Sequence, residues 1–495
     1  MKRFLKKRMR KRRNKLRQIH KSKIFWIIII FILVNTFMIA YHTSWKPLPE
    51  GISYKGETHS MEDIEFFYDL TYENKDGETV HERQIFQELG RTISEADDFI
   101  VADMFLFNGY TNGKNKFPPI SENLVDQIVQ QKEKHPDLKV VFITDQINTI
   151  YKSYESETIR RLEDAGVDVV LTNINKLRDS NPLYSSVWRL FFSWMGTEGQ
   201  GWIGNPIAKE APDVTLRSYM KLLNIKANHR KLLVTEDSAI VQTANPHDAS
   251  GYHENVAFKM KGPIIKDILE AEEAVVNYSG EADFPEYENM TFEKQEGNLK
   301  TKFVTEGKIY RSILEELKKA GEGDNVWLGM YYLADRKVID QLDKAADRGA
   351  VVNIIMDPNK KAFGHQKPGL PNLPVAAEMK NLGNKNINMR WYEVNIEQFH
   401  TKMLYIDKQK ENVIIAGSAN YTRRNLANLN LEADVVIKGP PSEEVFKEVD
   451  SYFKRIWNND NGETYTAEYS EFQGNLTFIR YVTYYLQKWT WFTTY

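Results

Sequence analysis

Two stretches of the sequence place a histidine two positions before a lysine and then lead to an asparagine. They read NHRKLLVTEDSAIVQTAN (228–245) and FHTKMLYIDKQKENVIIAGSAN (399–420), and their histidines are 171 positions apart. Histidine exchanges protons near neutral pH and can also act as a nucleophile. Two copies of one histidine–lysine grouping therefore indicate chemistry in which two imidazoles act on the same substrate.

Phosphoryl transfer suits this set of residues. It needs an attacking atom, an acid that protonates the leaving oxygen, and donors that bind the nonbridging oxygens. We predict that His229 and His400 face each other across a phosphate, so that one attacks phosphorus while the other protonates the departing alcohol. The donors to the phosphate oxygens are then the lysines and asparagine amides of both stretches, Lys231, Lys402, Asn245 and Asn420. This chemistry requires no metal ion or cofactor.

The elements around the two stretches also repeat. In a β-strand, side chains two positions apart share a face, so each histidine points into the same cavity as its lysine. The flanking segments match in one order: 97–107 with 324–334, 138–145 with 350–357, 167–173 with 387–395, and 254–278 with 432–457. Both segments of the last pair contain a strand, a Lys-Gly-Pro turn and an amphipathic helix. We predict an α/β fold of two tandem lobes related by a pseudo-twofold axis, with strands alternating with helices.

The sequence divides into six predicted segments. They are a basic arm (1–23), an apolar span (24–41), a linker (42–82), a first lobe (83–285) with an aromatic insertion (175–227), a second lobe (286–460) and an aromatic C-terminal tail (461–495). The insertion is either an apolar surface that faces lipid or shapes a cleft, or an ordinary buried helix. The tail either dips into a membrane interface or packs across the second lobe as a final helix.

The apolar span predicts a membrane anchor. Residues 24–41 form 18 consecutive uncharged residues, close to the roughly 20 that cross a bilayer as a helix. A cleavable signal peptide and a buried core helix are the alternatives, but the long basic arm and the missing cleavage site favour an uncleaved signal-anchor. Basic residues stay on the cytoplasmic side, so we expect a single-pass protein of the cell membrane with its lobes on the outer side.

Composition limits the possible partners and chemistry. The 495 residues contain no cysteine, which excludes disulfides, thiolate metal sites and a cysteine nucleophile. The basic arm holds 13 of the 66 Lys and Arg residues, and the rest of the chain has 53 basic against 68 acidic side chains. Because the body of the protein lacks a basic field, we expect no nucleic acid partner and instead a phospholipid substrate at the membrane.

The paired stretches resemble the phospholipase D superfamily, whose motif is His-x-Lys, four residues, Asp, then Gly-Ser-x-Asn. The second stretch fits throughout, with His400, Lys402, Asp407, Gly417, Ser418 and Asn420. The resemblance covers both lobes and looks closest to the bacterial cardiolipin-synthase-like branch, although such synthases generally begin with two membrane spans rather than one. It implies two α/β/α lobes with the active site at their junction, and ping-pong phosphodiester chemistry through a phosphohistidine. It also implies that one chain holds a complete site, so that a monomer suffices.

The resemblance also implies roles for individual residues. His229 is then the nucleophile and His400 the general acid, and a carboxylate downstream of each motif orients a histidine. Glu254 and Glu432 stand at comparable places, 25 and 32 residues after their histidines. The motif's hydroxyl and carboxylate positions are assigned to substrate binding: Thr243, Ser418 and Asp407.

The first stretch departs from the motif. Glu236 stands where Asp is expected, and Gln242-Thr243 replaces Gly-Ser, although Thr243 keeps a hydroxyl. Three classes of function therefore remain. The first is a membrane-anchored phospholipase or phosphatidyltransferase. The others are a hydrolase of another phosphodiester, such as nucleic acid or cell-wall teichoic acid, and a degenerate lipid-binding homologue.

Overall fold

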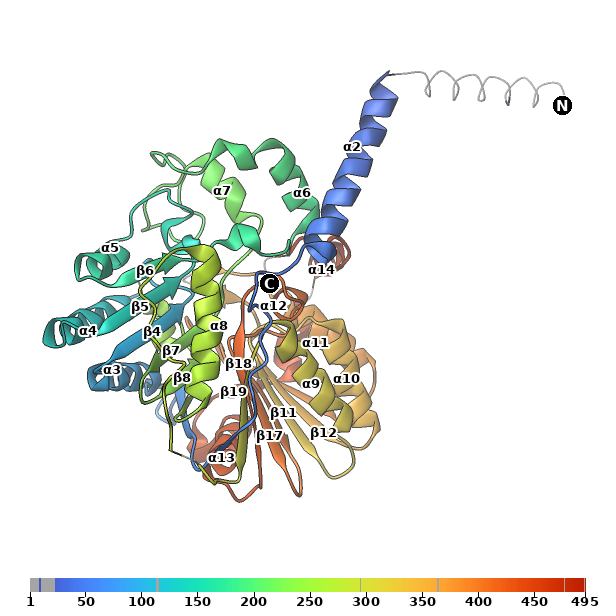
Figure 1. Cartoon of the computed structure of the whole chain (residues 1–495). Helices are drawn as coiled ribbons and strands as arrows, with labels where there is room; N and C mark the ends of the chain where they lie inside the picture. The colour runs from blue at the N-terminus through green and yellow to red at the C-terminus, as the bar shows by residue number, and fades with distance from the viewer. Residues whose placement is uncertain are drawn as a thin grey trace, which may run out of the picture.

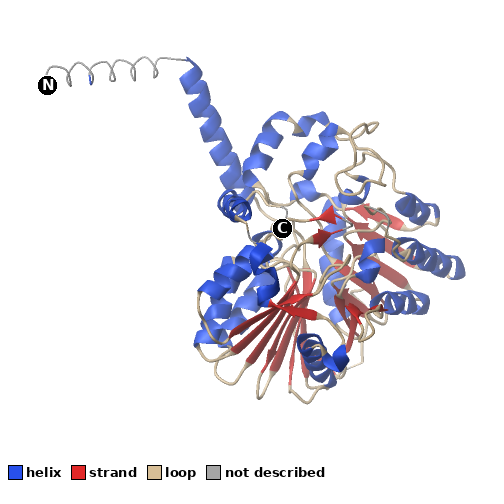
Figure 2. Ribbon diagram, turned by 180° about the vertical axis from the view of Figure 1, so that it is seen from behind, coloured by secondary structure: helices blue, strands red, loops and turns tan. Residues whose placement is uncertain are grey.

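Two sheet-based lobes and one projecting helix make up the computed structural model (Figure 1). The structure describes Met9 and residues 23–112, 115–293, 295–362, 365–475, 477–493 and 495. Apart from Met9 and Lys23, the predicted basic arm lies outside the described residues. Seen from behind, the strands of the two lobes converge on the middle of the molecule, and helices cover their outer sides (Figure 2).

The first lobe contains an eight-stranded mixed sheet in the order β3-β2-β9-β8-β7-β4-β5-β6. Strands β4, β5 and β6, which end at the sheet edge, run parallel to one another, and the remaining pairs are antiparallel. The strands are β2 (Glu65–Glu73), β3 (Thr79–Glu82), β4 (Phe99–Met104), β5 (Lys139–Thr144), β6 (Asp168–Leu171), β7 (Lys231–Thr235), β8 (Ala239–Gln242) and β9 (Asn255–Met260).

The second lobe contains a nine-stranded mixed sheet in the order β1-β10-β18-β17-β16-β11-β12-β15-β19. The strands are β1 (His59–Met61), β10 (Leu299–Thr305), β11 (Asn325–Met330), β12 (Val351–Met356), β15 (Ile387–Tyr392), β16 (Lys402–Asp407), β17 (Asn412–Gly417), β18 (Ala433–Gly439) and β19 (Thr466–Glu468). A separate hairpin joins β13 (Lys361–Ala362) to β14 (His365–Gln366).

Seven strands of each sheet follow the same order, with the same parallel and antiparallel pairings. The series β2-β9-β8-β7-β4-β5-β6 corresponds to β10-β18-β17-β16-β11-β12-β15. Register agrees as well, since Met104 pairs with Lys231 in the first lobe and Met330 pairs with Lys402 in the second. The predicted fold, two α/β lobes behind one apolar helix, is confirmed.

Helices cover the outer face of each sheet. In the first lobe these are α3 (Ile85–Glu95), α4 (Ile120–Lys134) and α5 (Glu157–Asp164), and in the second α9 (Gly307–Lys319), α10 (Arg336–Asp347) and α11 (Asn372–Asn381). Two long helices, α8 (Ile264–Ser279) and α13 (Glu444–Asn458), follow the Lys-Gly-Pro turns and contact the opposite lobe at β10 and β2 respectively. Shorter helices are α6 (Pro182–Phe191), α7 (Leu216–Leu222) and α12 (Arg423–Leu426).

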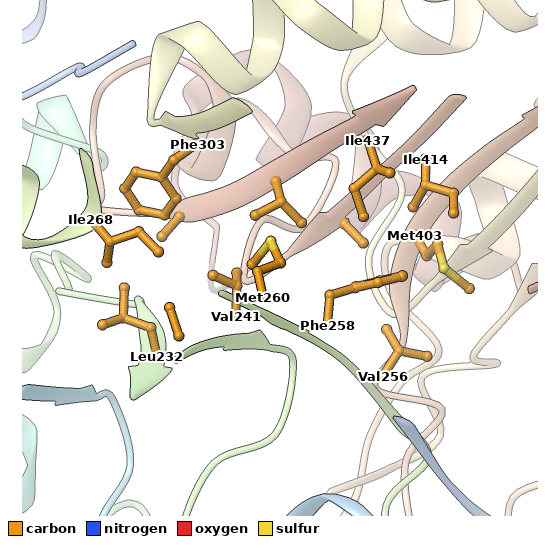
Figure 3. Packing of buried hydrophobic residues seen from close by; sticks show 14 of the residues in the cluster. Leu232, Val241, Val256, Phe258, Met260, Ile268, Phe303, Met403, Ile414 and Ile437 are labelled. Carbon is orange, nitrogen blue, oxygen red and sulfur yellow. The ribbon is translucent and has the colours of Figure 1, made fainter. Parts of the chain in front are cut away.

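One apolar core joins the inner faces of the two sheets. Leu232, Val241 and Phe258 from the first lobe meet Phe303, Met403 and Ile437 from the second (Figure 3). All six side chains are less than 10% exposed. Because alternate strand residues face opposite sides, the same strands also supply the separate cores beneath the outer helices. The shared core fixes the lobes against each other and so sets the geometry of anything held at their junction.

Segments outside the two predicted lobes also join the sheets. Residues 42–82 were expected to be a linker, but they supply β1 to the second sheet and β2 and β3 to the first. β2 pairs with β9, about 190 positions later, and such long-range pairing leaves no local signal. In the C-terminal tail, β19 becomes an edge strand, while α14 (Phe478–Thr490) buries Tyr484 against the second lobe.

The apolar helix and the aromatic insertion lie side by side. Among the described residues, one helix, Lys23–Trp45, is long and apolar enough to cross a membrane; it comprises α2 (Lys23–Ala40) and a π-helical end, η1 (Tyr41–Trp45). Helix α6 contacts α2 through Phe191 and Phe31, whose ring centroids are 6.1 Å apart, and Ser186 Oγ donates to Asn35 Oδ1 at 2.8 Å. The insertion is therefore not an ordinary buried helix.

Candidate active site

The two histidines precede β7 and β16 and lie at the junction of the lobes. Each backbone N–H donates across the lobe boundary, His229 to the carbonyl of Leu431 at 2.9 Å and His400 to the carbonyl of Glu254 at 2.9 Å. The short bridges Asn228–Leu431 and Glu254–Phe399 repeat this arrangement with the lobes exchanged. The backbone of the site therefore obeys the pseudo-twofold symmetry of the fold.

Each lysine turns back toward its own histidine. Lys231 Nζ donates to the carbonyl oxygen of His229 at 2.7 Å, and Lys402 Nζ donates to that of His400 at 2.6 Å. An aromatic ring at the end of the central strand closes each side. The Phe105 centroid lies 4.8 Å from the His229 ring and 5.1 Å from Lys231 Nζ.

Tyr331 occupies the matching place in the second lobe, since both aromatics directly follow the methionine that pairs with the site lysine. Its centroid lies 5.1 Å from the His400 ring and 5.3 Å from Lys402 Nζ. The two aromatics were not predicted as site residues. They stand in the matched segments 97–107 and 324–334, and alignment of these segments on their methionines would have found them.

The groups that hold the imidazole Nδ1 atoms come from the opposite lobe, and they differ. His229 Nδ1 lies 2.9 Å from Glu432 Oε2, whereas His400 Nδ1 lies 3.1 Å from Asn255 Oδ1. Glu432 and Asn255 are fully buried. An acceptor at Nδ1 requires a proton there in the neutral ring, so it leaves the lone pair on Nε2 free to react.

Motif hydroxyls support both acceptors in the same way. Ser418 Oγ donates to Glu432 Oε2 and accepts from the N–H of Ala433 at 3.0 Å. Thr243 Oγ1 donates to Asn255 Oδ1 at 3.1 Å and accepts from the N–H of Val256 at 3.0 Å. Thr243 therefore reproduces the contacts of the motif serine, and both hydroxyls serve the residue behind a histidine rather than the cavity in front of it.

Asn255, and not Glu254, is the counterpart of Glu432. Glu254 Oε1 accepts from the N–H of Thr71 at 3.2 Å, and its carboxylate makes no hydrogen bond to His400 among the described residues. The matched segments 254–278 and 432–457 both begin with a glutamate, and matching these two glutamates led to the wrong neighbour. Counting back seven positions from Gly262 and from Gly439, the glycines of the Lys-Gly-Pro turns, gives Asn255 and Glu432.

Asp407 does not lie at the site. It ends β16, five residues beyond Lys402, which corresponds to roughly 16 Å of strand. Its carboxylate faces Asn325 at the start of β11, with 3.5 Å between Oδ2 and Nδ2. Glu236 also binds a strand end in the first lobe, where its carboxylate accepts from the N–H groups of Asp97 at 2.6 Å and Phe99 at 3.2 Å. The Asp-to-Glu departure therefore affects a strand end and not the cavity.

Burial and, after it, neighbouring positive charge determine the pKa values of the site histidines. Burial, followed by the charges of Lys231 and Lys402, lowers the pKa of His229 well below its ordinary value. Burial and Lys402 do the same to the pKa of His400. Burial lowers the pKa of Lys231 to about 7, with Glu432 opposing that shift. A bound anion would offset the lysine charges and raise these pKa values, so the site favours an anionic substrate.

The motif asparagines complete the cavity. Asn245 and Asn420 are each about 95% buried, and their Oδ1 atoms have no hydrogen-bond partner among the described residues. Buried amide groups normally find a partner. Because Oδ1 accepts, the missing partner is a donor such as a hydroxyl group, whereas the Nδ2 groups of the same amides can donate to phosphate oxygens.

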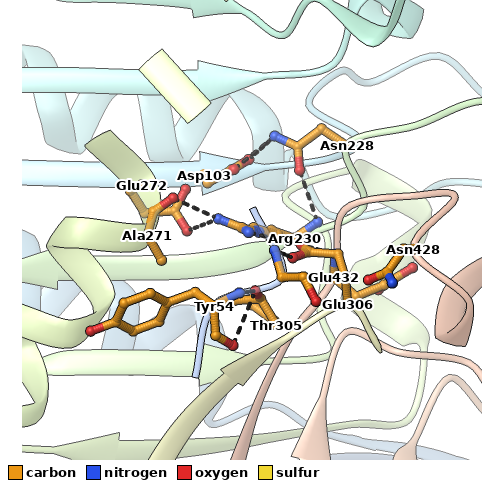
Figure 4. A network of polar contacts seen from close by, with 12 residues as sticks. Tyr54, Asp103, Asn228, Arg230, Ala271, Glu272, Thr305, Glu306, Asn428 and Glu432 are labelled. Atoms are coloured by element: carbon orange, nitrogen blue, oxygen red, sulfur yellow. Dashed lines mark hydrogen bonds and ion pairs between the residues drawn. The ribbon is translucent and has the colours of Figure 1, made fainter. Parts of the chain in front are cut away.

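A buried ion network lies behind the His229 side of the site (Figure 4). Arg230 is fully buried and donates to Glu272 on α8 and to Glu306 of the second lobe, both at 2.8 Å. Glu306 Oε1 also accepts from the N–H of Glu432 at 3.1 Å. Because strand alternation turns Arg230 away from His229, the network fixes the backbone of the histidine and of its carboxylate partner from behind.

The arrangement has the parts that phosphodiester chemistry needs. It brings together both predicted histidines, both lysines, both asparagines and Glu432, and it adds Asn255, Phe105 and Tyr331. Two imidazoles with oriented Nδ1 atoms, next to two buried ammonium groups, can attack and protonate opposite sides of one phosphate. Fold and site together define a two-lobe phosphodiesterase-like protein.

Comparisons with known proteins agree with this class. Residues 313–457 match the family model described as cardiolipin synthase, PLD-like domain. No curated protein matches the sequence. Among solved structures, the phosphatidylserine synthase of Haemophilus influenzae Rd KW20 is similar with a TM-score of 0.52 and 11% identity, covering 84% of this chain and 90% of that chain. The family match therefore covers most of the second lobe, and the structural similarity shows a shared fold over both lobes.

Two further solved structures show weaker similarity. The polyphosphate kinase of Porphyromonas gingivalis has 12% identity and a TM-score of 0.41, with 81% of this chain and 51% of that chain covered. A phospholipase D family member of Salmonella typhimurium has 19% identity and a TM-score of 0.26, with 32% and 95% covered.

Proposed function

We propose that the protein is a membrane-anchored phosphodiesterase or phosphatidyltransferase that cleaves or exchanges a phospholipid headgroup. The observation that carries this proposal is the convergence of His229 and His400 at one junction, each oriented by a residue of the opposite lobe. A solved phosphatidylserine synthase of similar fold and a matching cardiolipin synthase domain support a phospholipid as the substrate class.

In the first step Nε2 of His229 attacks phosphorus. A P–N bond forms while the P–O bond to the headgroup alcohol breaks, and His400 gives its Nε2 proton to the leaving oxygen. Phosphorylation leaves a positive charge on the His229 ring, which the Glu432 carboxylate stabilises at 2.9 Å. Lys231 and Lys402 bind the nonbridging oxygens, and Asn245 and Asn420 donate amide protons to them.

In the second step the His400 ring is neutral, and its unprotonated Nε2 removes a proton from water or from an acceptor alcohol. The oxygen attacks phosphorus, the P–N bond breaks, and His229 is regenerated. Water gives hydrolysis and phosphatidic acid, whereas an alcohol gives headgroup exchange. The neutral amide of Asn255 stabilises the imidazolium of His400 less than a carboxylate does, so His400 remains the better acid of the two.

Exposed apolar side chains beside α2 support a site at a membrane surface. In the insertion, Trp194 is 73% exposed and Trp202 is 69% exposed, and in α14 Trp489 is 84% exposed. Aromatic rings of this kind favour the interface between lipid and water. We propose that α2 anchors the chain and that the insertion and α14 rest on the outer leaflet. Extraction of the protein from membranes by alkaline carbonate would contradict the anchor.

The test of the function is mass spectrometry of products after the full-length protein is incubated in mixed lipid micelles with and without glycerol. We expect phosphatidic acid in the absence of glycerol, or a glycerol-exchanged lipid in its presence, and no product from His229→Ala. Equal turnover by that variant would remove the mechanism. Turnover of teichoic acid or DNA without any lipid product would assign the same chemistry to another phosphodiester.

A further inference from the structure

A cavity separate from the histidines, with a mainly apolar lining that also holds several charged side chains, lies at the segment that follows Asn420. Its volume is about 370 Å³, and it is bounded by Ser180 of the insertion, α9, the start of α10, the segment 422–427 and the C-terminal tail. None of the predicted catalytic residues lines it. The segment 422–427 directly follows Asn420, and Asn425 of this segment donates to Glu432. The cavity therefore shares one wall with the support of His229 but is a separate space.

Arg424 is a buried cation that has no carboxylate partner among the described residues. It is 6% exposed, and its Nη2 donates only to neutral acceptors: Asn181 Oδ1 at 3.2 Å, and Thr493 through its carbonyl oxygen at 2.6 Å and its Oγ1 at 3.1 Å. Its Nε is buried without a hydrogen-bond partner among the described residues. Burial lowers the pKa of Arg424 to about 9, which records the cost of this unpaired charge.

Most of the other charges around the cavity are already used. Arg336 and Lys488 pair with Glu378 at 2.5 and 3.1 Å. The Asp335 carboxylate caps α10 and accepts from Tyr310. By contrast, Arg423 stacks on the Trp491 ring at 3.9 Å, and the structure records no ion pair for it or for the exposed Lys337 among the described residues. Among the described residues the cavity thus has three cationic groups that form no close ion pair, with Asp335 as the nearby carboxylate that acts on Arg423.

We propose that this cavity is a binding site for a phosphate group, with Arg424 and Arg423 as its principal ligands. Guanidinium groups match the oxygen geometry of phosphate and form charge-assisted hydrogen bonds to it. Trp491, Tyr484 and Tyr495 add apolar surface, which suits a phosphate that carries an organic substituent. The tail that completes the cavity ends next to α6, and α6 contacts α2, so a lipid headgroup can reach the site from the membrane side.

Equilibrium dialysis of radiolabelled inorganic phosphate against the full-length protein in nonionic detergent tests this proposal. We expect the wild type to bind one phosphate at the histidines and a second in the cavity. Arg424→Gln should weaken the second binding about tenfold or more, because a charge-assisted hydrogen bond is lost, and leave the first unchanged. Arg160→Gln, which removes an exposed arginine from α5, is the matched control and should bind like the wild type.

Arg423→Gln keeps the test decisive if the buried Arg424 variant does not fold, since Arg423 is only half-buried and stacks on the Trp491 ring. The number of phosphates bound separates the cavity site from the histidine site. If the wild type binds one phosphate and the arginine variants bind none, the result supports the cavity site alone. Binding that neither arginine variant changes overturns the cavity site. Displacement of the second phosphate by short-chain phosphatidylglycerol assigns the source as a lipid headgroup, and failure of the lipid to displace it assigns free phosphate.

Discussion

His229 and His400 occupy equivalent positions in the two lobes, yet the groups behind their Nδ1 atoms differ in charge. Backbone hydrogen bonds, lysine contacts and hydroxyl supports repeat across the pseudo-twofold axis. The acceptors do not, because Glu432 is a carboxylate and Asn255 an amide. The backbone of the site is therefore symmetric, and single side chains give the two imidazoles different environments.

The residues between each histidine and its lysine show the same division. Arg230 enters an ion network with Glu272 and Glu306, whereas its counterpart Thr401 shares one hydrogen bond with Tyr452 at 3.1 Å. Both sets face away from the cavity. At the position between histidine and lysine, the nucleophile side therefore has an ion network and the acid side a neutral hydrogen bond. Substitution can test each comparison.

Removing each imidazole is the strongest test of unequal roles. His229→Ala should lower turnover by about 10⁴-fold for every substrate, because the attacking atom is lost. His400→Ala should lower turnover of a natural alkyl headgroup by about 10²–10⁴-fold. It should release p-nitrophenolate from an activated phosphodiester in a first turnover at less than about tenfold reduced rate, since that leaving group needs no proton. Burst kinetics with both substrates measures this, and equal losses in both variants would contradict the assignment.

Substitution of Arg230 should lower the free energy of unfolding far more than substitution of Thr401. Arg230→Met leaves Glu272 and Glu306 buried without a counter-ion, and we expect a loss of about 3–5 kcal/mol in the free energy of unfolding. Thr401→Val removes one neutral hydrogen bond, for a loss of about 1 kcal/mol. Urea denaturation followed by circular dichroism compares the two variants. Similar midpoints would mean that the network adds nothing to the junction.

Neutralising Glu432 should make the two sides of the site alike. Glu432→Gln keeps an acceptor for His229 Nδ1 but removes the charge that stabilises the phosphorylated ring. We expect a decrease in kcat of about 100-fold with little change in KM, since the lost interaction strengthens in the transition state. Rapid-quench measurement of phosphohistidine should show slower formation. An unchanged kcat would exclude a catalytic contribution from the carboxylate.

Adding charge behind His400 should have the smallest effect. In the wild type, burial and Lys402 lower the pKa of His400. Asn255→Asp places a carboxylate at Nδ1, which raises that pKa because the protonated ring is stabilised. His400 must be protonated at the start of the reaction, so the high-pH limb of the kcat/KM profile should move upward by about one pH unit. Asn245 and Thr243 remain in place, and Thr243→Ser is a suitable control that should leave the limb where it is.

Much of the fold could be predicted from the sequence because the repeat is local and ordered. Matched segments ending in Asp145 and Asp357 predicted equivalent buried strands, and in the structure both carboxylates accept backbone N–H groups next to a site histidine. The segment containing β2 was missed because its partner lies about 190 positions away. Edge strands such as β19 are short and depend on the neighbouring strand for their order.

The candidate site was predictable where residues act within one strand and less so where chain distance misleads. His229 with Lys231, and His400 with Lys402, follow from strand alternation. Asp407 belongs to the same motif, yet it lies at the opposite end of β16 from Lys402. Asn255 escaped notice because the matched segments 254–278 and 432–457 both begin with a glutamate, which favoured Glu254 over the neighbouring amide.

The unlike acceptors also bear on how such a chain could arise. In a homodimer of one ancestral lobe, a single codon would specify both acceptors, so every change from carboxylate to amide would strike both imidazoles at once. Fusion of two copies into one gene frees the codons from each other, and Asn255 and Glu432 then diverge independently. The joined pair can therefore inherit specialised halves, whereas a dimer of identical lobes cannot.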